Sequence, residues 1–276
     1  VLIEGVPGVA KTLLARLTAR LIDADFSRIQ FTPDLMPSDV LGTTVFNMKT
    51  NEFDFHQGPI FADIVLVDEI NRAPAKTQAA LFEVMEERQI SIDGITHKMG
   101  ELYTILATQN PVEQEGTYKL PEAQLDRFLM KITMDYPSLE EEVNILERHH
   151  TNASLIKLDD IKPAITKEEL LSLRALMNQV FVDRTLLQYI ALIVQQTRTS
   201  KAVYLGASPR ASVAMLQSSK AYALLQGRDF VTPEDIKFVA PYVLQHRLIL
   251  TAEAEMEGYS PVKVTQRLID KVEVPK

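Results

Sequence analysis

The sequence predicts an α/β fold, in which a largely parallel sheet flanked by helices is followed by a small all-helical domain. Two observations predict it. Short apolar runs alternate with helical segments over residues 1–137, which is typical of a parallel sheet with helices on both faces. From Ser138 onward the sequence shows helices and no convincing strand. We therefore expect an α/β core over residues 1–137, a linker helix and loop over 138–164, and a helical domain over 165–276.

The composition of the 276-residue chain argues against several classes of function. Its net charge of −8 argues against a broad nucleic-acid-binding surface, although a local basic patch is compatible with this net charge. The absence of cysteine excludes disulfides and thiolate chemistry, and the five scattered histidines have no zinc-ligand spacing. No apolar run approaches the roughly 18 residues that a membrane span needs. We expect a cytoplasmic protein without a membrane segment.

The chain begins inside its first predicted strand. Val1 already belongs to the apolar run that leads into the following loop. A natural protein is expected to start with Met and to have residues before a buried strand. We therefore expect a truncated N-terminus, with any targeting signal outside this sequence.

The loop after the first strand is typical of phosphate binding. A buried strand is predicted over residues 1–4 and a helix over 13–24, with GVPGVAKT between them. Successive N–H groups of such a loop point at an anion, and the helix N-terminus adds positive potential. Lys11 would reach the β- and γ-phosphates of a nucleotide, and Thr12 would bind Mg²⁺. Ala10 replaces the usual glycine, which requires a negative or mildly strained φ. The alternative is a chance turn before an amphipathic helix.

Two β-hairpins are predicted within the α/β core. A short strand over residues 29–31 is followed by turn signals, and residues 45–57 then alternate around a polar tip. Residues 89–93 and 95–99 flank Asp93-Gly94, a strong hairpin signal. Between the hairpins we expect a buried strand over residues 63–69 and a helix over 71–87.

The other elements carry clear cap signals. Thr166 and Glu169 form a capping box, and Ser208 with Pro209 begins a helix that Gly227 ends. In the core we expect a strand over residues 102–107, a helix over 121–127 and a strand over 128–134. In the rest we expect helices over 138–150, from 166 onward, and over 183–199, 208–226 and 232–250, with a loop over 151–163.

Three residues at the ends of predicted strands suit nucleotide hydrolysis. Asp68 would bind Mg²⁺, and Glu69 would orient and polarise the attacking water as a general base. Two acids also suit a helix N-cap, but the phosphate-binding loop upstream favours the functional interpretation. Asn110 would hydrogen-bond the γ-phosphate and the water, with a simple turn over residues 109–111 as the alternative. Because the carboxyl ends of parallel strands share one edge, we expect Thr12 to join these residues.

Arginines outside the loop are candidates for stabilising the transferred phosphoryl group. Arg127 ends a predicted helix, and a cation beside the transferred phosphoryl group raises the rate of hydrolysis by about 10³–10⁵-fold. The alternative is a surface pair with Asp126, which contributes little. Arg210 stands in the first turn of a helix, against the helix dipole, which indicates an anion nearby. The alternative is a solvated side chain. Arg72 is a weaker candidate, with a structural or interface role as the alternative.

Five segments together resemble the MoxR branch of the AAA+ ATPases. They are GVPGVAKT, IVLVDEINRAP, ATQNP, LPEAQLDRF and GASPRAS, in this order over essentially the whole chain. The resemblance implies an α/β ATPase core with a helical lid, and ATP and Mg²⁺ as cofactors. It also accounts for Ala10, since this branch uses the same variant of the loop.

The resemblance implies a role for each candidate residue. It places Walker A at residues 5–12, Walker B at Asp68 and Glu69, sensor 1 at Asn110, the arginine finger at Arg127 and sensor 2 at Arg210. The finger acts on the nucleotide of the neighbouring subunit, so a ring, commonly a hexamer, is the expected active form. The expected catalytic residues are Lys11, Glu69, Asn110, Arg127 and Arg210, and the expected metal ligands are Thr12 and Asp68. Nucleotide contacts are expected from Gly5, Val6, Pro7, Gly8, Val9, Ala10, Lys11, Thr12, Leu13 and Arg210.

The resemblance also implies partners. The hairpins at residues 45–57 and 89–99 match two insertions that face the ring pore in this clade. MoxR proteins resemble chaperones that mature or activate protein complexes, often with a partner that carries a von Willebrand factor A domain. Adenine contacts lie partly upstream of the loop in this family, so we assign none. Two alternatives stay open: a DNA motor like the MCM helicases, which the net acidity disfavours, and a nucleotide-binding scaffold without turnover.

Overall fold

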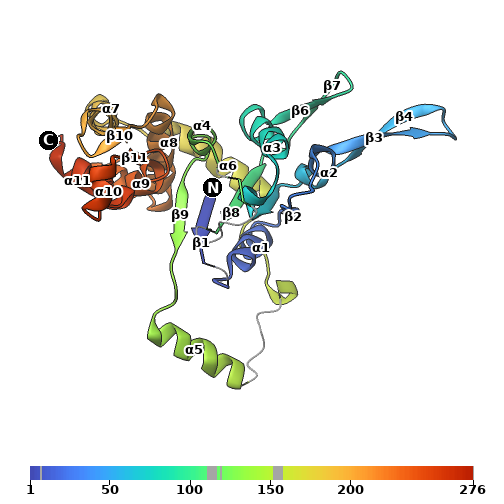
Figure 1. The fold of residues 1–276 in the computed structure, drawn as a ribbon, viewed down its shortest axis with the longest axis horizontal. Coiled ribbons are helices and arrows are strands. Elements are labelled where there is room, and N and C mark those ends of the chain that lie inside the picture. Colours follow the sequence, from blue (N-terminus) through green and yellow to red (C-terminus); the bar gives the residue numbers. More distant parts are fainter. Residues whose placement is uncertain (7, 111–116, 119, 152–157, 276) are drawn as a thin grey trace. The chain divides into compact units, whose positions relative to one another are not determined.

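The computed structural model describes residues 1–6, 8–110, 117–118, 120–151 and 158–275, apart from the side chain of Asp159 (Figure 1). The chain forms two compact units. The first comprises Val1–Lys119 and Ile132–Leu171, and the second comprises Leu120–Lys131 and Ser172–Lys276. The short segment Leu120–Lys131 is thus grouped with the helical residues, a long-range association that the sequence did not indicate.

A five-stranded sheet forms the centre of the first unit. Its strands are β1 (Leu2–Gly5), β2 (Phe26–Gln30), β5 (Ile64–Asp68), β8 (Thr104–Gln109) and β9 (Lys131–Met134). They lie in the order β2-β5-β8-β1-β9, and β5 runs parallel to both β2 and β8 while β8 runs parallel to β1. Every residue of β5 is buried, as its run of four apolar residues predicts. The expected parallel α/β core is confirmed.

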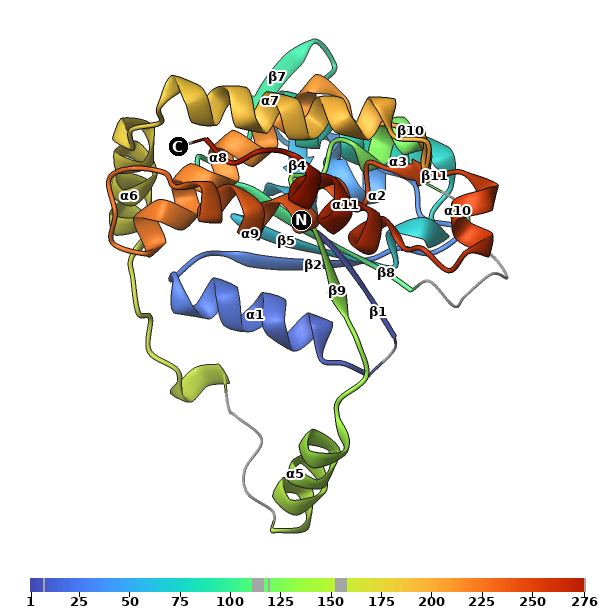
Figure 2. The same cartoon turned by 90° about the vertical axis from the view of Figure 1, so that its left-hand side faces the viewer.

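Helices cover both faces of this sheet, as predicted. The chain moves from β1 through α1 (Lys11–Leu21) to the edge strand β2, and later in the opposite direction from β5 through α3 (Ala75–Glu87) to β8. Right-handed crossovers in opposite directions place their helices on opposite faces. Figure 2 shows α1 on one side of β2 and β5 and α3 on the other. The small buried residues Ala15 and Ala19 let α1 approach β5 closely.

Both predicted hairpins are present in the first unit. One consists of β3 (Gly42–Asn47) and β4 (Glu52–Gln57), and the other of β6 (Gln89–Ile92) and β7 (Ile95–Lys98). Asp93 and Gly94 both have positive φ, 51° and 80°, which is the geometry of a type I′ turn. The unit also contains α2 (Pro37–Leu41), α5 (Leu139–His150), η1 (Pro59–Phe61), η2 (Ile70–Arg72) and η3 (Leu158–Asp160).

The second unit is mainly helical. Its helices pack around a core that includes Tyr189, Ile193, Met215, Leu244 and Leu268. The chain enters it through α6 (Lys167–Gln179). Its further helices are α4 (Glu122–Leu125), α7 (Arg184–Thr199), α8 (Pro209–Leu225), α9 (Pro233–Leu244), α10 (Ala252–Met256) and α11 (Pro261–Lys271).

Two expectations for the helical region were wrong. A two-stranded sheet is present where no strand was expected, formed by β10 (Val203–Leu205) and β11 (Ile249–Leu250). Strands of three and two residues are too short to show an alternating pattern. The helix expected to reach about residue 250 ends at Leu244 instead. The next three residues leave the helix to bind the segment Leu120–Lys131, a tertiary contact that local sequence does not encode.

Candidate nucleotide-binding site

The loop between β1 and α1 has a strained backbone at Ala10. The φ of 58° and ψ of 27° lie in the left-handed region, which costs an alanine about 1–2 kcal/mol. Gly8 also has a positive φ, of 87°. The strand before the loop ends in Gly5, where a Cβ would lie only 2.6 Å from the carbonyl oxygen of Met134, so no larger residue fits. Pro7 lies outside the described residues.

The loop is accessible to a ligand. The side chains of Val6, Val9 and Thr12 are partly exposed, and Gly8 is exposed. Leu13, the last residue expected to contact the nucleotide, is 38% exposed in the first turn of α1. The positions are compatible with the contacts expected of them, and those contacts stay a prediction.

The first two residues of α1 make different contacts. The Lys11 ammonium donates a hydrogen bond to the carbonyl of Gly5 at 2.6 Å, which closes the loop onto its own start. The Thr12 hydroxyl donates to Oδ2 of Asp68 at 3.4 Å. The start of α1 and the end of β5 therefore meet directly, as expected for elements at the same sheet edge.

Three side chains donate to the buried carboxylate of Asp68. Its Oδ1 accepts from the hydroxyl of Thr108 at 3.0 Å, and its Oδ2 accepts from Nε of Arg28 at 2.6 Å in addition to Thr12. The side chain of Asp68 is 9% exposed and that of Arg28 is 51% exposed, so the ion pair opens to solvent on its cationic side. A cation thus already lies against the carboxylate that is expected to bind Mg²⁺.

Glu69 combines a strained backbone with a restrained side chain. Its φ of 57° and ψ of 51° are left-handed, a conformation that recurs at functional sites. Its Oε2 accepts from Nε2 of Gln30 at 2.7 Å and lies 3.2 Å from Nε of Arg72. Arg72, the weaker arginine candidate, is therefore an ion-pair partner of the expected general base.

Thr108 links the two acids through its hydroxyl group. The hydroxyl donates to Asp68 and accepts from the backbone N–H of Glu69 at 3.0 Å. Thr108 was not among the residues predicted from the sequence, and neither were Arg28 and Gln30. A signal for the latter pair existed, since residues two apart on a strand share a face. The register that pairs Gln30 with Asp68 brings that face to the acids.

Asn110 lies directly after β8, at the same edge as the two acids. It is buried, with 6% of its surface exposed. Since β8 lies between β5 and β1 in the sheet, Asn110 follows a strand that adjoins both Asp68 and the start of the loop. This position suits contact with a γ-phosphate, although its expected role stays a prediction.

The two remaining candidates, Arg127 and Arg210, both belong to the second unit. Arg127 directly follows α4 and its C-cap Asp126, and Arg210 lies in the first turn of α8. Both side chains are exposed. A surface pair with Asp126 was the alternative role for Arg127, and the carboxylate of Asp126 forms an ion pair with Arg247 at 2.9 Å. The expected roles of both arginines stay predictions.

A pocket of about 600 Å³ adjoins the loop within the first unit. It is lined by residues 8–10 of the loop, by residues 134–137 and by one face of α5 from Glu141 to Arg148. The aromatic ring of Tyr136 offers an apolar surface, and Arg148 a cation. The volume of the pocket is large enough for a nucleoside.

The described residues contain no cluster of three or more His, Asp or Glu side chains suited to a metal. Any Mg²⁺ would therefore need oxygen atoms from Thr12 and Asp68 together with those of a bound phosphate, the oxygen donors that Mg²⁺ prefers. Thr12 and Asp68 are close enough to serve as such a pair. Among the helices of the described part of the chain, none has the length and apolarity to cross a membrane.

Two family models match the chain. Residues 1–130 match the ATPase family associated with various cellular activities (AAA), and residues 195–270 match the AAA lid domain. The matched ranges correspond to most of the α/β unit and most of the helical unit.

Similar proteins and structures cover the whole chain. It is 48% identical to the uncharacterised protein YeaC of Bacillus subtilis, over 100% of this chain and 85% of that protein. It is 45% identical to the chaperone MoxR1 of Mycobacterium tuberculosis, over 100% of this chain and 74% of that protein. The crystal structure of a candidate ATPase from Cytophaga hutchinsonii matches with a TM-score of 0.89 and 42% identity, over 100% of this chain and 85% of that one.

Proposed function

This chain belongs to the MoxR family of AAA+ ATPases, and we propose that it hydrolyses ATP in a hexameric ring to remodel client protein complexes. The observation that carries the proposal is the contact between Thr12 and Asp68. It joins the start of the helix after the phosphate-binding loop to the end of the central strand. These are the two places from which a P-loop enzyme holds a nucleotide and its metal.

The first unit supplies the groups that hold the nucleotide. The loop residues Gly5 to Leu13 surround the phosphates, and Lys11 exchanges the Gly5 carbonyl for the β- and γ-phosphates. Thr12 and Asp68 hold Mg²⁺, whose charge offsets that of the phosphates when it is bound. The nucleoside extends into the pocket beside residues 8–10, with Tyr136 against the base.

Glu69 acts on the attacking water. Its carboxylate is held by Gln30 and Arg72 in this structure, so it must exchange at least one of these partners to accept a proton from water. Thr108 fixes the backbone from which the side chain turns. Asn110 donates to the γ-phosphate and orients the same water.

The second unit supplies the two catalytic arginines. Arg127 completes the site of the neighbouring subunit, and Arg210 contacts the γ-phosphate. Both stabilise the charge that spreads over the phosphoryl oxygens in the transition state. This arrangement makes turnover dependent on ring formation.

The hairpin β3–β4 suits contact with a protein client. Its exposed apolar side chains include Met48 and Phe53, which are 90% and 72% exposed. Such a surface favours protein over nucleic acid, in agreement with the net charge of −8. A partner with a von Willebrand factor A domain and a cytoplasmic location stay predictions.

Steady-state ATP hydrolysis by wild type and Glu69→Gln tests the proposal. The variant keeps the shape of the side chain but cannot accept a proton, so we expect turnover to fall by about 10²–10⁴-fold while ATP binding is retained. Glu83→Gln removes an equal charge from the exposed side of α3 and should leave turnover unchanged. Wild-type turnover in Glu69→Gln would exclude Glu69 as the base.

The same variant tests the client role. Glu69→Gln, which holds ATP, should retain client complexes from native lysate. Replacing Met48 and Phe53 by serine should abolish that retention and leave ATP turnover intact. Equal retention with and without these two side chains would exclude the hairpin as the client-binding element.

A further inference from the structure

Three residues that follow α9 hold the segment that carries Arg127. Nε2 of Gln245 donates to the carbonyl of Lys131 at 2.6 Å, and Nε2 of His246 lies 3.0 Å from the carbonyl of Phe128. Arg247 makes the largest set of contacts, described below. Each of the three residues is at most 9% exposed. All these contacts lie within the second unit.

The guanidinium of Arg247 donates hydrogen bonds to Asp126 and Phe128, the two residues on either side of Arg127 in the sequence. Its Nε donates to Oδ1 of Asp126 at 2.9 Å, and its Nη2 donates to the carbonyls of Asp126 at 3.1 Å and Phe128 at 2.6 Å. Its Nη1 donates to the carbonyls of Leu129, at 3.2 Å, and Val243. Only a planar fork with five N–H groups can serve this set of acceptors. The backbone on either side of Arg127 is thus fixed by one side chain that is 3% exposed.

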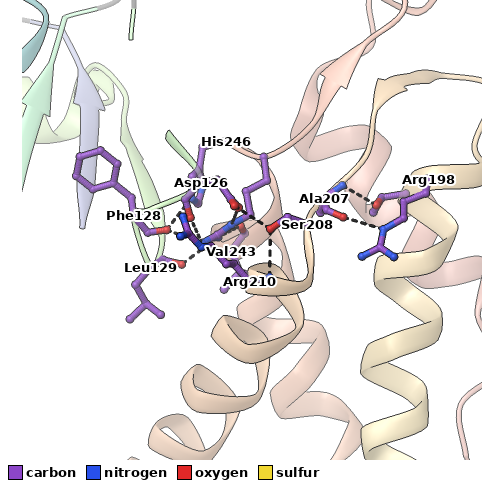
Figure 3. A network of polar contacts seen from close by, with 11 residues as sticks. Asp126, Phe128, Leu129, Arg198, Ala207, Ser208, Arg210, Val243 and His246 are labelled. Carbon is purple, nitrogen blue, oxygen red and sulfur yellow. Dashed lines mark hydrogen bonds and ion pairs between the residues drawn. The ribbon is translucent and has the colours of Figure 1, made fainter. Parts of the chain in front are cut away.

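The second oxygen of Asp126 leads to the helix that carries Arg210. Its Oδ2 accepts from the hydroxyl of Ser208 at 2.8 Å. The same hydroxyl accepts from the backbone N–H of Arg210 at 3.1 Å and so caps α8. Figure 3 shows Asp126 between Ser208 and the segment of Phe128 and Leu129. One carboxylate is therefore shared between the backbone next to Arg127 and the start of the helix that bears Arg210.

The electrostatics agree with this close arrangement. Burial lowers the pKa of Arg247, the hydrogen bond and charge of Asp126 raise it, and the charge of Arg210 lowers it further. Arg210 thus lies near enough for its charge to act on the buried guanidinium. A buried cation is tolerated because Asp126 and the four carbonyls compensate it, and removing either partner of such a pair is strongly unfavourable.

We propose that Arg247 is a positioning residue that, through Asp126 and Ser208, holds Arg127 and Arg210 in one fixed arrangement, so that the two catalytic arginines move as a single body. This inference rests on the roles proposed above for these two arginines. Because Arg127 serves the neighbouring subunit and Arg210 contacts the γ-phosphate, the arrangement couples these two roles within the second unit.

The first test compares Arg247→Lys with Arg228→Lys. Lysine keeps the charge but cannot replace the fork, so we expect kcat for ATP to fall by about 10²-fold, the effect of a displacement of about 1 Å at a catalytic group. Arg228 makes a bidentate pair with Asp235 in the same unit, without any link to Asp126 or Ser208. Arg228→Lys is expected to keep kcat within twofold of wild type. Wild-type kcat in Arg247→Lys would overturn the proposal.

A double variant separates positioning from general stability. If Arg247 acts through Arg127 and Arg210, Arg247→Lys should lower kcat by a smaller factor in the Arg127→Ala background than in wild type, because only the Arg210 part of its effect is left. Losses that multiply would overturn the proposal. If Arg127→Ala itself has the kcat of wild type, the finger assignment in the proposed function fails instead, and this outcome is separate from the first two.

A milder variant keeps the test decisive if Arg247→Lys does not fold. Ser208→Ala breaks the link between Asp126 and the start of α8 while the guanidinium stays in place. Ser260 caps α11 in the same way, by accepting from the N–H of Lys263 at 3.3 Å, so Ser260→Ala loses a comparable cap. We expect Ser208→Ala to lower kcat at least fivefold and Ser260→Ala to leave it unchanged. Equal kcat in the two variants would overturn the proposal.

Discussion

Replacing Arg28 by methionine is expected to tighten the binding of ATP with Mg²⁺. The guanidinium of Arg28 lies against Oδ2 of Asp68, with Nε at 2.6 Å. In the proposed site this oxygen would turn to the metal when the nucleotide binds, so the ion pair would compete with the metal for the same carboxylate. Methionine replaces the aliphatic part of the arginine side chain and removes the competing charge.

The size of the effect follows from the exposure of the pair. The side chain of Arg28 is 51% exposed, so solvent screens the interaction despite its short distance and the burial of Asp68. Exposed ion pairs contribute about 0.2–1 kcal/mol, and the upper end suits this geometry. About 1 kcal/mol corresponds to a factor of about 5 in affinity.

Titration calorimetry of Mg²⁺ into protein with saturating ATP measures this factor. The half-saturating Mg²⁺ concentration should be about fivefold lower for Arg28→Met than for wild type. Arg16→Met removes an exposed arginine from α1 and should leave this concentration unchanged. An unchanged or higher value in Arg28→Met would refute the competition, because the arginine would then support metal binding or ignore it.

Three further predictions test individual parts of the structure. Ala10→Gly should raise the free energy of unfolding by about 0.5–1 kcal/mol, because glycine relieves the strain of the left-handed backbone. The control Ala79→Gly, on the exposed face of α3, should lower it by about 1 kcal/mol. Equal losses of stability for the two variants in denaturant unfolding would contradict this prediction. Thr108→Val removes the hydroxyl that links the two acids, so ATP turnover should fall about tenfold with a loss of about 1–3 kcal/mol in stability, and full turnover would exclude its role. His246 is held neutral because burial lowers its pKa to about 3, so its contribution to stability is complete above pH 6.5 and falls by about 2 kcal/mol between pH 6.5 and pH 5. The free energy of unfolding should therefore depend less on pH in His246→Gln than in wild type over this range. The same pH dependence in both proteins would contradict a neutral, buried His246.

Local patterns were sufficient to predict the sheet and its hairpins. The apolar run that ends at Asp68 predicted a strand buried on both faces, and Asp93-Gly94 predicted a tight turn. These features depend on residues that are adjacent in the sequence, or that alternate along one strand. The same is true of the loop, where a glycine-containing segment lies between a strand and a helix.

The sequence predicted that Thr12 meets Asp68, but it did not predict several other contacts between distant residues. Arg28 and Thr108 each lie 40 positions from Asp68, and Arg247 lies 121 positions from Asp126. The order of the strands in the sheet and the position at which α9 ends bring these pairs together. Neither feature leaves a periodicity or a motif in the sequence. The short strands β10 and β11 were not predicted for a related reason. In the described part of the chain they form a two-stranded sheet with each other, and they are far apart in the sequence.

The central claim is that the loop before α1 and the end of β5 hold one ATP molecule with its Mg²⁺. A crystal structure of Glu69→Gln with ATP and Mg²⁺ tests it most directly. We expect the Lys11 ammonium to have left the Gly5 carbonyl for the β- and γ-phosphates, with the metal between Thr12 and Asp68. A triphosphate bound elsewhere, with Lys11 still on Gly5 and Asp68 still on Arg28, would contradict the claim.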